Sequence, residues 1–374
     1  MKIVLMCLSI VMIATLLNGC QNNVTRIDNP EFNKTADKYT NIYASDFESD
    51  GPHHPYDNID FLKHEEKKSA ERSFIGFAYS GIDKTHGFNY ASLLSSDIEI
   101  NKQNKGHITW LGHASFLIQQ SNGDALVTDP VFDEFDGFGW LGSQLDDSLK
   151  RLGKAPINSE QLSFVNGVMI SHNHYDHLHN DSLNRFSENT RLYLPLDNAE
   201  HVDFDQGPII EMDWYTQTKH DDTSIHFLPA NHTSSRGISD HEESLWGSWL
   251  LQDGSYSVYF AGDTGYSPIF KDMHSKFGDI DVCLMPIVAY PGPARKMHLA
   301  PEDAIKAAQD LGCKIFVPWG YGTWSLGYEH VNEPLRRLAK AVEDMKPNFI
   351  VKPLKMGESL NYVELLKLKR IVLN

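Results

Sequence analysis

The chain contains few cysteines and few positively charged residues for its length. Only four of its 374 residues are cysteine, which excludes a scaffold built from disulfide bonds. Lys and Arg number 33 against 50 Asp and Glu, so the formal net charge is −17. Because binding to a phosphate backbone needs clustered positive charge, we expect no nucleic acid partner.

Two common catalytic signals are also missing. The sequence has no GxSxG motif and no cysteine in a reactive context, which argues against a Ser or Cys nucleophile. No internal repeat, low-complexity tract or second long apolar run follows the first twenty residues. The composition, with 41% hydrophobic and 11% aromatic residues, is that of a globular protein and excludes disorder throughout.

The N-terminal sequence predicts an export signal. Lys2 precedes an uncharged apolar run that ends at Leu17, too short for a membrane-spanning helix. Residues 17–20 read LNGC and resemble the lipobox of bacterial lipoproteins, which implies a signal peptide at 1–19 and membrane anchoring through a lipidated Cys20. With Gln21 following, sorting rules favour the outer membrane, facing the periplasm. The alternative is an ordinary secretory signal with an incidental cysteine.

The remaining chain divides into three parts. Residues 20–50 are rich in Asn and Asp and predict a tether, and 51–104 form an N-terminal extension without assignable chemistry. From 105 to 374, short apolar runs alternate with turn residues, which predicts strands, and helices are expected at 301–312 and 332–345. This order predicts an α/β fold in which helices cover sheet layers.

Two cysteines lie within this last part. Cys283 and Cys313 both fall in apolar, strand-like runs. We expect them to be buried thiols rather than a disulfide, although the sequence does not determine their pairing.

One short segment concentrates groups that bind metal ions. Residues 172–177 read HNHYDH and directly follow the predicted strand VMIS, where a loop can direct several side chains to one point. Imidazole and carboxylate groups together are the ligands of Zn²⁺ or a similar divalent ion. Two later predicted strands, SIHFLPANH and SVYFAGD, end in His232 and Asp263. The predicted metal ligands are therefore His172, His174, Asp176, His177, His232 and Asp263.

These residues resemble those of the metallo-β-lactamase superfamily, and in particular its branch of phospholipases D that hydrolyse N-acylphosphatidylethanolamine. The supporting strings, in order, are TWLGHASFLI, TDPVF, SHNHYDHL, LPANH, LWGSWLL, YFAGDTGYSPIF, MPIVAYPGP, HLAPEDA and PWGYGTW. The resemblance implies an αβ/βα sandwich with one or two Zn²⁺ ions at one edge, and a homodimer. In this arrangement His172, His174 and His232 hold one zinc, Asp176 and His177 hold the second, and Asp263 bridges them.

The resemblance also implies roles for four residues near the metal ions. Asp176 would act as a catalytic residue besides being a ligand. His298 would stabilise or protonate the leaving group, although it could equally be an N-terminal capping residue of the helix expected at 301–312. Asp129 would orient a ligand imidazole, although it could equally be a turn residue before a proline. His113 belongs to the same pattern and lies near the site.

The sequence departs from the branch at one position. Where relatives usually place a histidine that completes the second zinc site, this chain has Pro318, which offers no ligand atom. The second site would then use an extra water, borrow a neighbour such as His330, or stay empty.

Three functions fit these observations. The first is a zinc-dependent phosphodiesterase of phospholipase D type that acts on N-acylphosphatidylethanolamine-like lipids through a metal-bound hydroxide. The second is a lactonase or other hydrolase on the same fold, because a fold does not determine a substrate. The third is a non-catalytic envelope lipoprotein with an incomplete metal site.

Overall fold

The computed structural model describes most of the predicted hydrolase domain and short parts of the preceding chain. The described residues are 24–29, 38–43, 56–57, 59, 61, 85, 87–95, 100–134, 150–237 and 239–372. The predicted signal peptide and Cys20 lie outside them. Within the described residues, no helix has both the length and the apolar character needed to cross a membrane.

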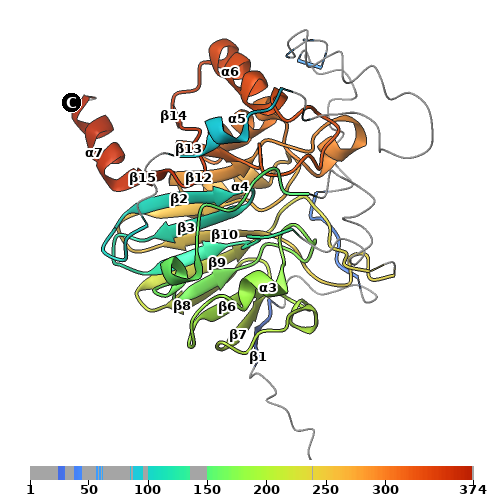
Figure 1. Cartoon of the computed structure of the whole chain (residues 1–374), viewed down its shortest axis with the longest axis vertical. Coiled ribbons are helices and arrows are strands. Elements are labelled where there is room, and N and C mark those ends of the chain that lie inside the picture. Colours follow the sequence, from blue (N-terminus) through green and yellow to red (C-terminus); the bar gives the residue numbers. More distant parts are fainter. Residues whose placement is uncertain are drawn as a thin grey trace, which may run out of the picture.

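Two mixed β-sheets form the centre of the molecule (Figure 1). The first has the strand order β1-β7-β6-β5-β4-β3-β2-β15 and the second β14-β13-β12-β11-β10-β9-β8. The strands of the first sheet are β1 (Val24–Ile27), β2 (His107–Gly112), β3 (Ser115–Gln119), β4 (Ala125–Thr128), β5 (Gly167–Met169), β6 (Arg191–Pro195), β7 (Ile209–Met212) and β15 (Ser359–Asn361). Those of the second are β8 (Thr216–His220), β9 (Thr223–Leu228), β10 (Ser248–Gln252), β11 (Ser257–Phe260), β12 (Ile280–Pro286), β13 (Cys313–Trp319) and β14 (Ile350–Val351).

Helices cover the outer faces of the sheets. The α-helices are α3 (Asn180–Leu183), α4 (Ile269–Phe277), α5 (Pro301–Asp310), α6 (Glu333–Met345) and α7 (Tyr362–Val372), and the short 3₁₀ helices are η1 (Tyr90–Leu93), η3 (Ser159–Leu162), η4 (Ala199–His201) and η5 (Gly292–Lys296). Helix α5 packs on β12, β13 and α6, whereas α3 and η3 contribute to a separate apolar cluster with the first sheet. The predicted αβ/βα sandwich is confirmed, and α5 and α6 correspond to the two helices predicted from the sequence.

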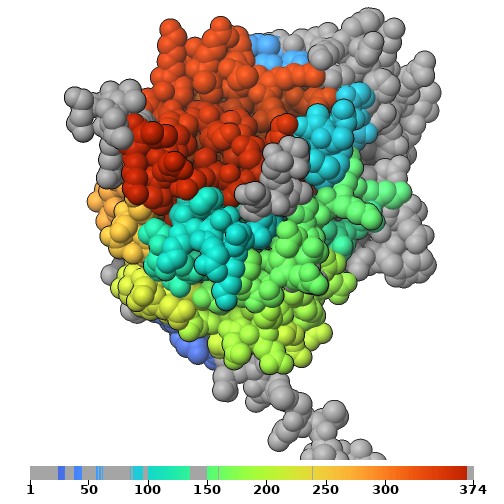
Figure 2. Space-filling view, turned by 60° about the vertical axis from the view of Figure 1, so that its left-hand side comes forward, coloured from blue at the N-terminus to red at the C-terminus, as the bar shows by residue number. Residues whose placement is uncertain are grey.

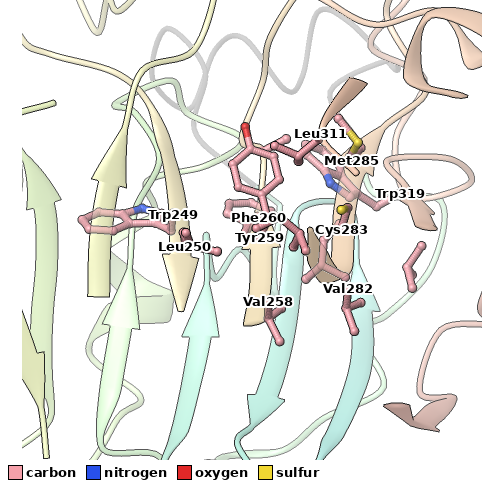
Figure 3. Packing of buried hydrophobic residues seen from close by; sticks show 14 of the residues in the cluster. Trp249, Leu250, Val258, Tyr259, Phe260, Val282, Cys283, Met285, Leu311 and Trp319 are labelled. Carbon is pink, nitrogen blue, oxygen red and sulfur yellow. The ribbon is translucent and has the colours of Figure 1, made fainter. Parts of the chain in front are cut away.

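Strand alternation explains why the central strands are apolar on both faces. Phe116 and Ile118 of β3 belong to the large core cluster, which joins both sheets and also includes residues of α5 and α6, while Leu117 belongs to the cluster under α3 and η3. Successive side chains of a strand point to opposite faces, so a strand covered on both sides has no polar face. Figure 3 shows part of the core, in which Trp249, Phe260 and other large side chains pack together.

The ends of the described chain are integrated into the first sheet. Strand β15 pairs with β2, and α7 lies beside it, with the red C-terminal segment against the teal strands in Figure 2. At the other edge, β1 pairs in parallel with β7. Residues 24–27 fall in the segment expected to be a tether, and this part of the expectation is wrong because a four-residue strand is too short to produce a recognisable sequence period.

The expectation for the two cysteines is also wrong. Cys283 of β12 and Cys313 of β13 form a disulfide, with their Cα atoms 6.1 Å apart. The two strands are neighbours in the second sheet. That separation is within the range that a disulfide spans, and it follows from strand pairing that the apolar runs do not reveal.

Candidate metal centre

All seven predicted metal-binding and catalytic residues lie together at one edge of the sandwich. They come from loops that follow β5, β9 and β11 and from the segment before α5. Their potential ligand atoms form overlapping groups in which every atom lies within 4.8 Å of the others in its group. The residues are His172, His174, Asp176, His177, His232, Asp263 and His298.

Three histidines form the first candidate metal position. The Nδ1 atom of His174 lies 2.8 Å from Nε2 of His172 and 3.2 Å from Nε2 of His232. Two nitrogen ligands of one tetrahedral zinc ion lie about 3.3 Å apart, so these spacings fit a shared ion. Burial lowers the pKa of His174 to about 4 and those of His172 and His232 well below the ordinary value. The imidazoles are therefore neutral, as metal ligands must be.

The second candidate position lies between two carboxylates and His177. The Nε2 atom of His177 is 3.6 Å from Oδ2 of Asp176 and 3.3 Å from Oδ2 of Asp263. This nitrogen is buried and has no hydrogen-bond partner among the described residues. Burial opposes protonation, but the charges of Asp263 and Asp176 raise the pKa of His177 well above its ordinary value. Two carboxylates facing one unpartnered imidazole nitrogen thus favour a cation between them.

Asp129 fixes the orientation of two predicted ligands. Its Oδ2 accepts hydrogen bonds from Nδ1 of His177 (2.7 Å) and Oγ of Ser171 (2.6 Å), and its Oδ1 accepts one from the Ser171 backbone N–H (2.7 Å). Ser171 Oγ in turn accepts from Nδ1 of His172 at 2.9 Å. Both imidazoles therefore donate a proton from Nδ1, so that Nε2 is the nitrogen directed toward a metal ion. This contact favours the orienting role of Asp129 over that of a simple turn residue.

His232 and His298 are held by backbone carbonyls and by neighbouring side chains. Nδ1 of His232 donates to the Met297 carbonyl at 3.0 Å, and the Asn41 side chain bonds both the N–H and the C=O of His232. Nδ1 of His298 donates to the Ala294 carbonyl at 3.2 Å, while its Nε2 lies 3.4 Å from Oδ2 of Asp263. The N-cap of α5 is Ala300, so His298 is not the cap of that helix.

Sequence reasoning did not identify Asn41 or Arg236 as part of this centre. Asn41 comes from the predicted tether, and no local pattern links it to His232. Arg236 donates to the carbonyls of Asn173 and Leu178, at 2.9 and 2.8 Å, and so holds both ends of the HNHYDH loop. His330, considered as a replacement ligand, does not belong to any of the potential metal-binding groups formed by the described residues.

The centre opens into a cavity of about 720 Å³. His174, His232 and Asp263 are among the residues that line it. Its walls are largely apolar and aromatic and include Tyr175, Val288, Met297, Trp324, Leu326 and Val331. A cavity of this size, apolar except for a few converging polar groups, is typical of a small-molecule or lipid site.

The fold and the site together define a class, the metal-dependent hydrolases with a metallo-β-lactamase fold. The sequence pattern of the Beta-lactamase superfamily domain matches residues 125–321, more than half of the chain. The chain therefore belongs to the metallo-β-lactamase superfamily, as its resemblance implied.

Two curated relatives and one solved structure are similar to the chain. An uncharacterized protein of Mycobacterium tuberculosis is 32% identical over 245 residues, which span 63% of this chain and 64% of that protein. N-acyl-phosphatidylethanolamine-hydrolyzing phospholipase D 1 of Caenorhabditis elegans is 30% identical over 271 residues, or 67% of this chain and 74% of that enzyme. The isothiocyanate hydrolase from Delia radicum gut bacteria shares the fold, with 17% identity, a TM-score of 0.52, and coverage of 68% of this chain and 98% of that one.

Proposed function

We propose that the protein is a zinc-dependent phosphodiesterase of phospholipase D type that hydrolyses N-acylphosphatidylethanolamine-like lipids. The observation that carries this proposal is a cluster of imidazoles and carboxylates that lines a large, mostly apolar cavity. The similarity to the Caenorhabditis elegans phospholipase D supports the lipid class.

The cavity suits an anionic headgroup attached to acyl chains. Arg236 lines it, and within the described residues no other Lys or Arg does. The guanidinium also lies over the Tyr175 ring, 4.4 Å from its centroid, which fixes its position. An arginine held in this way can attract a phosphodiester, while Val288, Met297 and Leu326 offer apolar surface to acyl chains.

Zinc at this centre would supply an activated water at neutral pH and offset negative charge on the phosphoryl group. The protein must then deliver a proton to the departing alcohol. His298 is placed for this, because it lines the cavity and its Nε2 is close to Asp263. Burial alone would lower the pKa of His298, but the hydrogen bond and charge of Asp263 raise it above the ordinary value. The raised pKa favours the protonated imidazole, which can donate its proton to the leaving alkoxide.

Asp176 would hold the second metal ion and orient the attacking water. Burial opposes its ionisation, but the charge of His177 and the hydrogen bond from His113 keep the pKa of Asp176 below its ordinary value. The carboxylate is thus ionised and can accept a hydrogen bond from the water.

Hydrolysis in ¹⁸O-labelled water tests the bond that breaks. The purified full-length protein would be given N-acylphosphatidylethanolamine in mixed micelles, and the products would be analysed by mass spectrometry. Attack at phosphorus places the label in phosphatidic acid and leaves the N-acylethanolamine unlabelled. Label in a released fatty acid, or opening of lactones with no cleavage of phosphodiesters, would contradict the proposal and favour another hydrolase activity.

A further inference from the structure

The second metal position has one neighbouring histidine to which the ligand assignments above give no role. His113 lies in the turn between β2 and β3, and its Nε2 is 3.1 Å from Oδ2 of Asp176. His113, Asp176 and His177 form one of the groups whose potential ligand atoms lie within 4.8 Å of one another. The imidazole therefore reaches the same point as the two neighbouring predicted ligands.

The end of β13 offers no ligand to this position. The ring of Trp319 packs edge-on against His113 and His177, with ring centroids 5.8 and 6.2 Å apart. Successive strand residues point to opposite faces, and Pro318 carries no donor atom in any case. An indole therefore occupies the β13 side of the site, and a further ligand must come from another element.

The backbone holds His113 firmly in a conformation that non-glycine residues rarely adopt. Its φ is +48°, in the left-handed region. Its N–H donates to Oγ1 of Thr323 at 2.7 Å, and its C=O accepts from Nε1 of Trp110 at 2.9 Å. The ring also packs against Trp324 with centroids 5.1 Å apart. Strained backbone of this kind persists where the surrounding structure fixes it, and it is frequent at functional sites.

Polar atoms at this point also lack partners. Nδ1 of His113 and Nε2 of His177 are both buried, and neither has a hydrogen-bond partner within the described ranges. Buried polar atoms are normally satisfied, so the unpartnered Nε2 of His177 beside the carboxylates of Asp176 and Asp263 indicates a cation, and Nε2 of His113 reaches the same Asp176 oxygen. We propose that His113 is a direct ligand of the second metal ion and completes its coordination beside Asp176 and His177. This inference rests on the metal-dependent site proposed above.

Metal counting in two variants tests the ligand role. His113→Ala removes the imidazole, whereas His113→Gln retains a side-chain N–H that can donate to Asp176 but offers a poor ligand to zinc. We expect the wild type to bind two zinc ions per chain, and both variants to keep the first with unchanged affinity and to bind the second at least tenfold more weakly. Retention of the first zinc shows that each variant is folded. His330→Gln, at a buried histidine outside the metal-binding groups, is the matched control and should bind two.

Two results would overturn the inference. A His113→Gln variant that binds two zinc ions with wild-type affinity would show that the imidazole only orients Asp176 through a hydrogen bond. A wild-type protein that takes up a single zinc would show that there is no second ion for His113 to hold. Because counting zinc requires no substrate, an incorrect phosphodiesterase assignment would leave both readouts unchanged.

Discussion

Replacing Asp129 by Asn should weaken the second metal position without changing the backbone. Asp129 has a φ of +34°, a region that Asn tolerates well. The carboxylate accepts three hydrogen bonds, from the Ser171 N–H and Oγ–H and from Nδ1–H of His177. An amide has one acceptor oxygen, so in either orientation its NH₂ group faces at least one of these donors. Where the NH₂ group faces His177, that histidine can relieve the conflict only by moving its proton to Nε2, the nitrogen that faces the metal position.

Loss of such an orienting partner typically costs 10- to 100-fold in metal affinity, or about 1.4 to 2.7 kcal/mol. We expect a loss of this size for the second zinc, measured by competition with a chelator of known affinity. The first zinc should be less affected, because Ser171 still bonds His172. Asp253→Asn is the control. Asp253 lies in the turn between β10 and β11, and it likewise accepts hydrogen bonds from the N–H and the Oγ of a serine, Ser121. If Asp129→Asn binds both ions with wild-type affinity, Asp129 is not what keeps the proton of His177 on Nδ1.

Three further predictions concern catalysis, stability and anchoring. His298→Gln should lower kcat by about 10²- to 10⁴-fold while zinc content stays unchanged, and unchanged kcat would remove His298 from the mechanism. Glu302→Gln should lower the free energy of unfolding by about 3 to 5 kcal/mol near pH 7, because it breaks a buried pair with Arg337. Burial opposes ionisation of Glu302, but the hydrogen bonds and charge of Arg337 hold its pKa below the ordinary 4.5. The difference in unfolding free energy between wild type and Glu302→Gln, measured by denaturation, should therefore shrink as the pH falls below 4.5. Cys20→Ala should abolish metabolic labelling by fatty acid and release the protein from membranes; retained labelling would contradict the predicted lipoprotein processing.

The sequence predicted the parts of the centre that consecutive residues encode. The HNHYDH loop follows a buried strand, and His232 and Asp263 follow two others, so the sandwich brings them to one edge. The side chain of Asp129 lies beside them for the same reason, since it follows β4 directly.

The sequence could not predict contacts made between distant segments. Asn41 reaches His232 across 191 positions, and Arg236 closes the HNHYDH loop from 58 and 63 positions away. The disulfide between Cys283 and Cys313 depends on the pairing of β12 with β13. No local propensity encodes such contacts, because they follow from how the sheets and loops assemble.

Zinc titration of the metal-free protein, with hydrolysis and bound zinc measured on the same sample, tests the central proposal most directly. After treatment with a chelator, the protein should release no N-acylethanolamine from N-acylphosphatidylethanolamine, and activity should return as zinc fills the centre around His172, His174 and His232 and then the position beside His177. Full activity in the zinc-free protein, or a zinc-loaded protein that cleaves no phosphodiester, would contradict it.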